Sequence, residues 1–248
     1  MYLIGDIGNT DIKICLFDKN YKVVKKLVLK TNLISNKYLA LNLNFLKKYS
    51  SKINVILFSS VVPPVYYIIR KFLKKKLKQK CIELKQINLN KLIKIMVNKK
   101  QVGSDRISNA IGIIDKKLNY IILDFGTATT FDVVIKDKYL GGVIAPGVNL
   151  SLKTLISKAS LIPPVNISKI SKIIGTNTST AVKSGFYWGY AGLIDNVIKL
   201  IIKQTNKPFK IILTGGLANL FKNTIKGKIE VKKDLTLNGL LKVAKNLI

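Results

Sequence analysis

Residues 3–10 read LIGDIGNT, and residues 122–127 read ILDFGT. In each stretch an apolar run is followed by an aspartate, one apolar residue, a glycine and a small polar residue. The two aspartates, Asp6 and Asp124, lie 118 positions apart. An apolar run that stops at a glycine turn is typical of a buried strand, so each stretch predicts a strand that delivers a carboxylate to a tight bend. A repeat on this scale predicts two similar lobes with a cleft between them.

The residues around both stretches predict an α/β chain. Each stretch is followed by two short apolar segments joined by a polar turn, at 13–17 and 23–29 and again at 130–135 and 139–144, which predicts two hairpins. Other apolar patterns predict strands at 55–59, 81–84 and 209–213 and helices at 37–49, 63–80, 104–117, 178–203, 235–247 and from 148 onward. We expect one lobe over 1–117 and the other over 118–248.

The composition excludes several kinds of chemistry. The chain has 248 residues, of which 48% are apolar, and this is enough for a substantial core. The absence of histidine excludes a histidine base, a Ser-His-Asp triad and histidine-bound zinc. The two cysteines, Cys15 and Cys81, are too few for a disulfide scaffold. No transmembrane run and no signal peptide are expected, so the sequence predicts a cytoplasmic protein without membrane contact.

The net charge of +31 raises the question of a nucleic-acid partner. Only two of the 43 basic residues are arginines, Arg70 and Arg106, and the lysines are scattered along the chain. The one dense basic run, 70–78, has the apolar spacing of an amphipathic helix with a solvated lysine face. We therefore interpret the charge mainly as a compositional bias toward lysine, with nonspecific attraction of nucleic acid through the net positive charge.

The carboxylates are few and placed unevenly. There are 12, and four of them, Asp6, Asp105, Asp124 and Asp132, lie within or beside turns rich in glycine, threonine or serine. In the first such turn, Gly8 allows a tight bend whose amides can face phosphate oxygens, and Lys13 supplies a cation. Asp6 is suited to hold Mg²⁺ through water. An ordinary hairpin with a polar turn is the alternative.

Two further motifs add acids and glycines. The run DFGTATTFD at 124–132 repeats the phosphate-and-cation pattern of the first turn, although threonines also favour strands. In GSDR at 103–106, Asp105 is expected at a helix N-terminus, where it is either a cap or a functional acid. Arg106 offers a planar fork that suits a carboxylate or phosphate. Glycines at 141–142, 147 and 215–216 allow a close approach of backbone to a ligand.

Taken in order, these motifs resemble the type III pantothenate kinases over essentially the whole chain. The motifs that carry the resemblance are DxGNTxxK at 6–13, GxDR at 103–106, DxGTAT at 124–129, GG at 141–142 with PG at 146–147, and TGG at 214–216. The resemblance implies an actin-like fold of two duplicated ribonuclease-H-like lobes and a homodimer. It also implies ATP with Mg²⁺, a monovalent cation such as K⁺ or NH₄⁺, and phosphorylation of pantothenate to 4′-phosphopantothenate in coenzyme A biosynthesis.

The resemblance also implies roles for particular residues. Asp105 corresponds to the general base, Asp124 to the monovalent-cation ligand, and Thr127 to an ATP contact. The ATP phosphate loop corresponds to Asp6, Ile7, Gly8, Asn9, Thr10, Asp11, Ile12 and Lys13. Pantothenate contacts correspond to Gly103, Ser104, Asp105, Arg106 and Thr178.

The chain departs from the family pattern just before GxDR. The family usually carries a tyrosine and then a proline in this stretch, whereas residues 96–102 read MVNKKQV. We therefore expect a looser or altered pantothenate pocket. Two other functions remain as alternatives: a nonenzymatic transcriptional accessory protein that binds nucleic acid, and a kinase of the same fold acting on another small hydroxy or carboxylate substrate.

Overall fold

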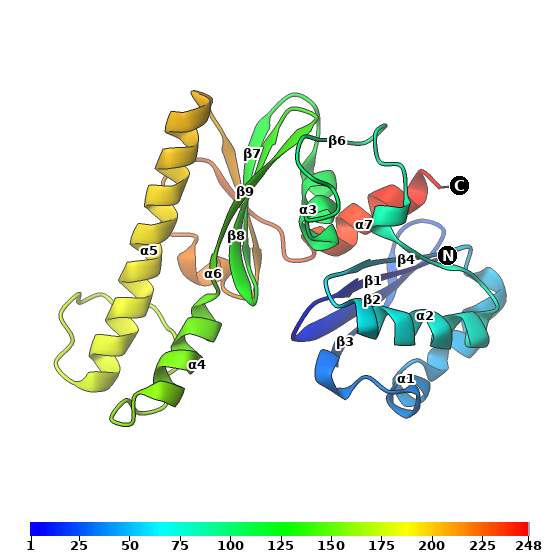
Figure 1. Cartoon of the computed structure of the whole chain (residues 1–248), viewed down its shortest axis with the longest axis horizontal. Helices are drawn as coiled ribbons and strands as arrows, with labels where there is room; N and C mark the ends of the chain where they lie inside the picture. The colour runs from blue at the N-terminus through cyan, green and yellow to red at the C-terminus, as the bar shows by residue number, and fades with distance from the viewer. Residues whose placement is uncertain (248) are drawn as a thin grey trace. The chain divides into compact units, whose positions relative to one another are not determined.

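The computed structural model describes residues 1–247, which form two compact units (Figure 1). The first unit combines Met1–Ile114, Asp137–Tyr139 and the chain from Asp234 onward, and the second combines Asp115–Lys136 with Leu140–Lys233. No helix within residues 1–247 is both long and apolar enough to cross a bilayer. The cleft between lobes and the lobe limits at 117 and 118 stay predictions.

The first unit is built on a five-stranded sheet in the order β3-β2-β1-β4-β5. Strand β1 pairs antiparallel with β2, which pairs antiparallel with β3, whereas β4 and β5 run parallel to β1. The strands are β1 (Tyr2–Ile7), β2 (Asp11–Phe17), β3 (Val23–Lys30), β4 (Val55–Ser60) and β5 (Cys81–Glu83). Because β1, β4 and β5 are parallel, their carboxyl ends meet at one edge of the sheet, where α/β proteins bind ligands.

The second sheet repeats this order as β9-β8-β7-β10-β11. Strand β7 pairs antiparallel with β8 and parallel with β10, and β10 pairs parallel with β11. The strands are β7 (Asn119–Phe125), β8 (Ala128–Ile135), β9 (Lys138–Pro146), β10 (Lys210–Gly215) and β11 (Ile229–Val231), and the short β6 (Lys94–Ile95) pairs with the first residues of β9. The predicted duplication is therefore present in the strand order.

The duplication extends to the hydrogen bonds around the two aspartate turns. The amide of Gly8 donates to the carbonyl oxygen of Asp11 at 3.1 Å, and the amide of Gly126 donates to that of Ala128 at 3.0 Å. The amide after the fourth strand of each unit donates back to the end of the central strand, in Val61 to Ile7 and in Gly216 to Phe125. Each unit thus places its aspartate on the same local scaffold.

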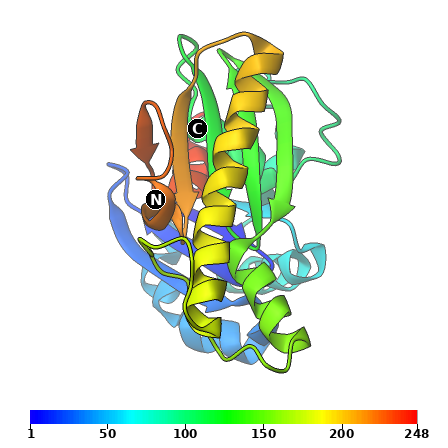
Figure 2. The ribbon, with the colours of Figure 1, turned by 90° about the vertical axis from the view of Figure 1, so that its left-hand side faces the viewer.

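Three helices pack in the second unit: α4 (Val148–Lys158), α5 (Thr178–Thr205) and α6 (Ala218–Phe221). Figure 2 shows the long α5 in front of the second sheet, with the shorter α4 beside the lower half of α5. The first unit contains α1 (Asn36–Asn42), α2 (Pro63–Leu77), α3 (Ser104–Ile113) and α7 (Leu235–Lys245), with 3-10 helices at Thr31–Leu33, Asn44–Lys52 and Leu84–Gln86. The last of these, η3, lies beside the candidate site.

Two predicted helices end four or more residues before the predicted limit. The helix predicted over 37–49 stops at Asn42, whose side-chain amide donates to the carbonyl oxygen of Tyr38, and the chain continues as a 3-10 helix. The helix predicted over 104–117 stops at Ile113, because Asp115 accepts the amides of Lys117 and Leu118 in a tight turn. Asparagine and aspartate compete with helical backbone bonds in this way.

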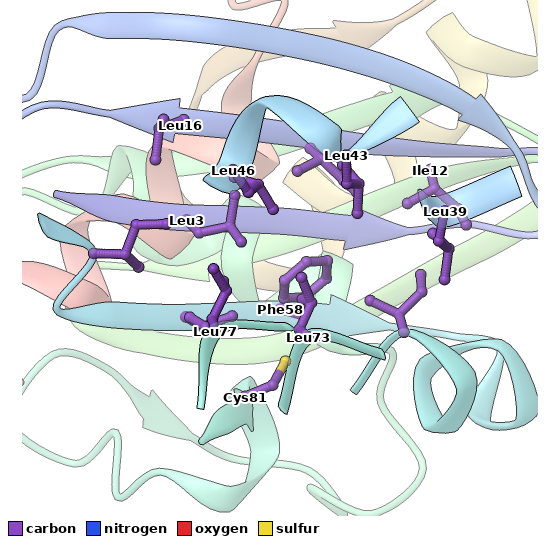
Figure 3. Packing of buried hydrophobic residues seen from close by; sticks show 14 of the residues in the cluster. Leu3, Ile12, Leu16, Leu39, Leu43, Leu46, Phe58, Leu73, Leu77 and Cys81 are labelled. Carbon is purple, nitrogen blue, oxygen red and sulfur yellow. The ribbon is translucent and has the colours of Figure 1, made fainter. Parts of the chain in front are cut away.

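The core of the first unit lies where the sheet meets α1 and α2 (Figure 3). Leu3 of β1, Phe58 of β4 and Leu73 of α2 are fully buried within it. Gly5 is required there, because a Cβ at that position would lie 2.0 Å from the ring of Phe58. Burial of such side chains contributes about 1.5–3 kcal/mol each, and it fixes β1 and hence Asp6 at its end.

A close crossing of α3 and α7 completes the first unit. A Cβ on Gly239 would lie 1.9 Å from the carbonyl oxygen of Ser108, so the two backbones touch. The Ser108 hydroxyl donates to the carbonyl oxygen of Thr236 at 2.7 Å, and the Thr236 hydroxyl donates to Asn109 at 2.8 Å. These buried bonds lock α3, and with it the GSDR motif, against α7.

Candidate active site

The predicted phosphate loop is the turn between β1 and β2. Thr31, the residue that directly follows β3, holds this turn through two hydrogen bonds. Its hydroxyl donates to the carbonyl oxygen of Gly8 at 2.8 Å, and its amide donates to the carbonyl oxygen of Thr10 at 3.1 Å. The Gly8 amide is engaged inside the turn with Asp11, so it does not face outward as the sequence had suggested. Asn9 and Thr10 are exposed at the tip of the turn. The turn is therefore pre-ordered before any ligand binds.

The flanks of this turn divide into apolar anchors and charged groups. The Ile7 and Ile12 side chains are fully buried, so only their backbones can face a ligand. Asp11 pairs with Lys30 at 2.7 Å. Asp6 and Lys13 are directly opposite in the antiparallel register, so their side chains share one face of the sheet. A carboxylate and an ammonium group are thus presented together at the edge of the sheet.

Asp6 is fixed from the neighbouring strand. The hydroxyl of Ser59, itself fully buried, donates to Asp6 Oδ1 at 2.6 Å. Asp6 remains half-buried. A carboxylate that is oriented by a hydroxyl and retains partial exposure fits the hard oxygen donors and water that Mg²⁺ requires. Among residues 1–247 no group of three or more acidic or cysteine side chains is gathered closely enough to hold a metal ion by itself.

The GSDR motif begins α3, as predicted. Ser104 is fully buried, and its hydroxyl accepts from the Ser60 amide at 2.8 Å and donates to the Ser60 carbonyl oxygen at 3.0 Å. These two hydrogen bonds hold the N-terminus of α3 against the end of β4, next to Ser59 and Asp6. The structure therefore brings the predicted phosphate loop and the predicted substrate motif to one corner of the first unit.

Asp105 is the acid at this corner. Its Oδ1 accepts from the Arg106 amide at 2.8 Å, and a Cβ on Gly103 would lie 2.3 Å from the same oxygen. Desolvation raises the pKa of Asp105, while the bond from the Arg106 amide, the Arg106 guanidinium and the Lys85 ammonium partly oppose that rise. A half-buried acid with a raised pKa at a ligand-binding edge is the profile of a general base.

Glu83 is a residue that the sequence analysis did not single out. It ends β5 beside the same corner, and its Oε2 accepts from the Lys85 amide at 2.6 Å. Desolvation raises its pKa, opposed in part by the Lys85 amide, the Ser104 hydroxyl, the Lys85 charge and the Ser60 amide. The signal available in the sequence was its rarity, since Glu83 is one of two glutamates in the chain.

The stretch that lacks the family tyrosine and proline is held by lysines. Lys85 Nζ donates to the carbonyl oxygen of Lys100 at 3.2 Å, and Lys99 Nζ donates to that of Ile87 at 3.0 Å. Within the stretch, the Val102 amide donates to the carbonyl oxygen of Asn98 at 3.3 Å. Two side-chain tethers thus connect residues 96–102 to η3 and the segment that follows it.

In the second unit, close backbone packing surrounds Asp124. Gly215 has a positive φ of 86°, and a Cβ there would lie 2.5 Å from the Phe125 carbonyl oxygen and 2.7 Å from Asp124 Oδ1. A Cβ on Gly147 would lie 2.2 Å from the carbonyl oxygen of Thr127. The Gly215 backbone therefore packs closely against the Phe125 carbonyl oxygen and the carboxylate of the half-buried Asp124, so that no larger residue fits at position 215.

Thr127 and Thr178 are both exposed on the second unit. Thr127 lies at the tip of the turn that follows Asp124. Thr178 begins α5 directly after Asn177, whose side chain accepts the Thr180 amide at 2.9 Å in a capping box. Their predicted contacts with ATP and pantothenate stay predictions, as do all the residue roles assigned from the sequence.

Comparisons with known proteins identify the family. A sequence model of the family described as type III pantothenate kinase matches residues 2–200. A type III pantothenate kinase from Pelagibacter ubique (strain HTCC1062) is 55% identical over 242 residues, covering 98% of this chain and 98% of that protein. Another, from Desulfosudis oleivorans, is 37% identical over 256 residues, covering 97% of each.

Solved structures agree at the level of the fold. A protein from Sinorhizobium meliloti named as a 2-dehydro-3-deoxygalactonokinase aligns with a TM-score of 0.63 at 10% identity, covering 100% of this chain and 99% of its own. A protein from Campylobacter jejuni assigned to the Baf family of transcriptional activators aligns with a TM-score of 0.62 at 20% identity, covering 99% and 98%. At such identities only a shared fold follows, and it confirms the α/β class with duplicated ribonuclease-H-like lobes. Since the family model spans most of the chain and both relatives align over nearly their full lengths, this chain belongs to the type III pantothenate kinase family.

Proposed function

We propose that this protein transfers the γ-phosphoryl group of ATP to the 4′-hydroxyl of pantothenate, which yields 4′-phosphopantothenate and begins coenzyme A biosynthesis. Family membership supports the reaction. The single structural observation that carries it is the corner at which the β1–β2 turn and the GSDR motif meet, through the Asp6–Ser59 and Ser60–Ser104 hydrogen bonds. A phosphate-binding turn and a positioned acid are the two parts that phosphoryl transfer to an alcohol needs.

In this proposal Asp105 is the general base. Its carboxylate accepts the proton of the attacking primary alcohol as the oxygen–phosphorus bond forms and the bond to ADP breaks. The raised pKa supports this role, because a base works best when its pKa approaches the working pH. Arg106 offers its guanidinium to the pantothenate carboxylate, a pairing that its planar fork favours. Most of the catalysis then comes from positioning rather than from covalent work by the protein.

The β1–β2 turn is proposed to hold the phosphates of ATP. Lys13 offsets negative charge that develops on the transferring group, and the exposed amides of the turn orient it. Asp6 is the residue that would hold Mg²⁺ through water, and the ion would neutralise phosphate charge when bound. Ser59 keeps the Asp6 carboxylate oriented toward that position.

We also propose a monovalent cation, K⁺ or NH₄⁺, at Asp124, with Thr127 as an ATP contact and Thr178 as a pantothenate contact. The crowding of Asp124 by the backbone of Gly215 supports the cation site. The enzyme is expected to act in the cytoplasm, where ATP is plentiful.

A homodimer is the proposed assembly. Pro146, α4 and α5 line an apolar hollow of about 460 Å³, in which Leu155, Val182 and Phe186 are prominent. Leu150 and Trp188 on the same two helices are 49% and 38% exposed. A second copy of the chain would cover this surface.

Light scattering should give twice the chain mass for the wild type and the monomer mass for Val182→Glu; a monomeric wild type would refute the dimer.

A panel of acceptors with labelled ATP tests the proposed reaction. Pantothenate should be phosphorylated, whereas acetate and hexoses should not. The Asp105→Asn variant, which keeps the shape of the side chain, serves as the matched control and should be nearly inactive. Transfer to a sugar in preference to pantothenate would favour another kinase activity. Sequence-selective DNA binding that survives physiological salt, without any transfer, would favour the regulatory alternative.

A further inference from the structure

A hollow with a strongly basic lining lies in the first unit, where the C-terminal end of α2 leads into β5. It has a volume of about 330 Å³ and is lined by Arg70, Lys74, Lys78, Gln79, Lys80 and Cys81. Four of these six residues carry a positive charge, and none of the six is acidic. The dense basic run at 70–78 therefore contributes three of its cations to one concave surface, which we call the basic hollow.

The end of α2 brings these cations together. Arg70, Lys74 and Lys78 follow one another at intervals of four residues, a spacing that places side chains on one face of a helix. Lys78 ends α2 in the left-handed conformation, with a φ of 55°. The next residue, Gln79, is anchored because its side-chain amide donates to the carbonyl oxygen of Ile53 at 2.5 Å. The turn that carries the basic hollow is therefore held in place by the fold.

The four cations of the basic hollow are not paired with acids of the described chain. Within residues 1–247, no ion pair is found for Arg70, Lys74, Lys78 or Lys80, and all four are exposed. Like charges that gather without a counter-ion repel one another, and this repulsion opposes the compact state. An anion bound among the four side chains would remove the repulsion.

The dipole of α2 explains only part of this arrangement. Cations are favoured in the last turn of a helix, where α2 carries Lys74, Lys75 and Lys76. Arg70 lies a full turn earlier and Lys80 lies beyond the helix, so the dipole does not account for either. Arg70 is also one of only two arginines among 43 basic residues. Its planar fork can donate two parallel hydrogen bonds to a phosphate or carboxylate, which a lysine cannot do.

The floor of the basic hollow is apolar. Cys81 is buried, and it belongs to the same core cluster as Leu73 and Leu77 of α2 (Figure 3). A wall of low dielectric concentrates the field of nearby charges, so the four cations attract an anion more strongly here than on an open surface.

We propose that the basic hollow is a second binding site for a chain of linked phosphates. Such a chain concentrates several negative charges on few atoms, which matches four grouped cations. No aromatic side chain of the described chain lines the hollow, and this disfavours single-stranded nucleic acid, whose bases need stacking partners. The site differs from the candidate active site, because Cys81 pairs with Ile56 early in β4, whereas the active-site corner is at Ser59 and Ser60 at its end.

The test is a calorimetric titration of the full-length protein with tripolyphosphate at physiological salt. Arg70→Gln/Lys74→Gln removes two cations of the basic hollow. Lys71→Gln/Lys75→Gln is the matched control, because it removes two exposed cations of the same helix that do not line the hollow. We expect the first variant to bind about tenfold more weakly than the wild type and the control to bind like the wild type. Equal weakening in the two variants, which have the same net charge, would show attraction by bulk charge alone and overturn the proposal.

Two further variants make the test specific. Lys13→Gln removes a cation of the proposed phosphate loop and should leave this binding in place, whereas loss of binding there alone would place the phosphate chain at the β1–β2 turn and overturn the proposal. If Arg70→Gln/Lys74→Gln folds poorly, Lys78→Asn/Lys80→Gln replaces it, since asparagine tolerates the left-handed backbone at position 78. An oligonucleotide that binds through Arg70 and Lys74 when tripolyphosphate does not would also overturn the proposal.

The same titration distinguishes two sources of the phosphate chain. Tighter binding of tripolyphosphate than of cytidine triphosphate would indicate a free chain, and the reverse would indicate a chain carried by a nucleoside. Either result supports the site if the binding depends on Arg70 and Lys74. A protein that phosphorylates no pantothenate would contradict the proposed function and leave this result unaffected, because the titration measures binding and not turnover.

Discussion

Gly103→Ala should separate catalysis from stability at the candidate active site. The added Cβ would lie 2.3 Å from Asp105 Oδ1, whereas an unstrained carbon–oxygen contact needs about 3.4 Å. The carboxyl group must therefore move by about 1 Å. A displacement of that size at a reacting group costs about 10²-fold in rate, which is about 2.7 kcal/mol of transition-state stabilisation.

The fold should tolerate the same change. Gly103 has φ −58° and ψ 136°, values that alanine adopts readily, and the next nearest contact of the new Cβ is a Val61 methyl group at 3.4 Å. Since alanine also restricts the unfolded chain, stability should stay equal or rise by about 0.4–1 kcal/mol. The Asp105 carboxyl, at the end of a side chain, absorbs the displacement.

The assay measures kcat and KM for pantothenate with ATP saturating, alongside urea unfolding. Gly192→Ala is the matched control, because nothing lies within 4 Å of a Cβ on that exposed helical glycine. We expect kcat to fall about 10²-fold in Gly103→Ala and to stay at the wild-type value in Gly192→Ala. Full turnover by a folded Gly103→Ala protein would show that the Asp105 position does not matter and would remove Asp105 from the role of base.

Three further predictions concern Asp105, the α3–α7 crossing and the cation site. Asp105→Asn should lower kcat by about 10²–10⁴-fold and yet stabilise the fold at pH 7, because a raised pKa means that ionised Asp105 costs stability. In urea titrations this advantage should shrink as the pH falls through the raised pKa and be absent below about 3.9, where the wild-type group is protonated in both the folded and the unfolded state. Gly239→Ala should destabilise the protein by about 3 kcal/mol or more, because its Cβ would overlap the Ser108 carbonyl oxygen, and a thermal midpoint equal to the wild type would contradict that packing. Asp124→Ala should weaken activation by potassium, and an unchanged potassium titration would exclude Asp124 as the ligand.

Much of the fold was predictable because its signals are local. The strand that ends at Asp6 and its counterpart at Asp124 follow from apolar runs that stop at glycine turns, and the repeat predicted the shared strand order. The start of α5 at Thr178 was also predicted, and the structure adds Asn177 as its cap. The early stop of the helix at Asn42 was missed, because side-chain competition for the backbone is decided residue by residue.

The sequence motifs of the candidate site could be predicted, whereas the residues that hold these motifs in place could not. Asp105 and Arg106 stand out by residue type beside a glycine. Ser59 and Ser60 do not, because their importance comes from the pairing of β4 with β1, which joins residues far apart in the sequence. The sequence also suggested an outward-facing Gly8 amide, whereas the turn uses that amide internally.

The contact between α3 and α7 has a consequence for how the protein folds. The hydrogen bond from Ser108 to Thr236 joins residues 128 positions apart. The helix that begins with the GSDR motif, α3, can therefore pack against α7 only after the C-terminal part of the chain has folded back onto the first unit. The entropy of closing such a loop grows slowly with its length, but folding slows as native contacts become non-local. The β1–β2–β3 meander can form from neighbouring residues alone. During refolding, recovery of turnover should therefore lag behind recovery of the spectroscopic signal of the β-strands. The reason is that Asp105 becomes ordered among the last parts of the first unit.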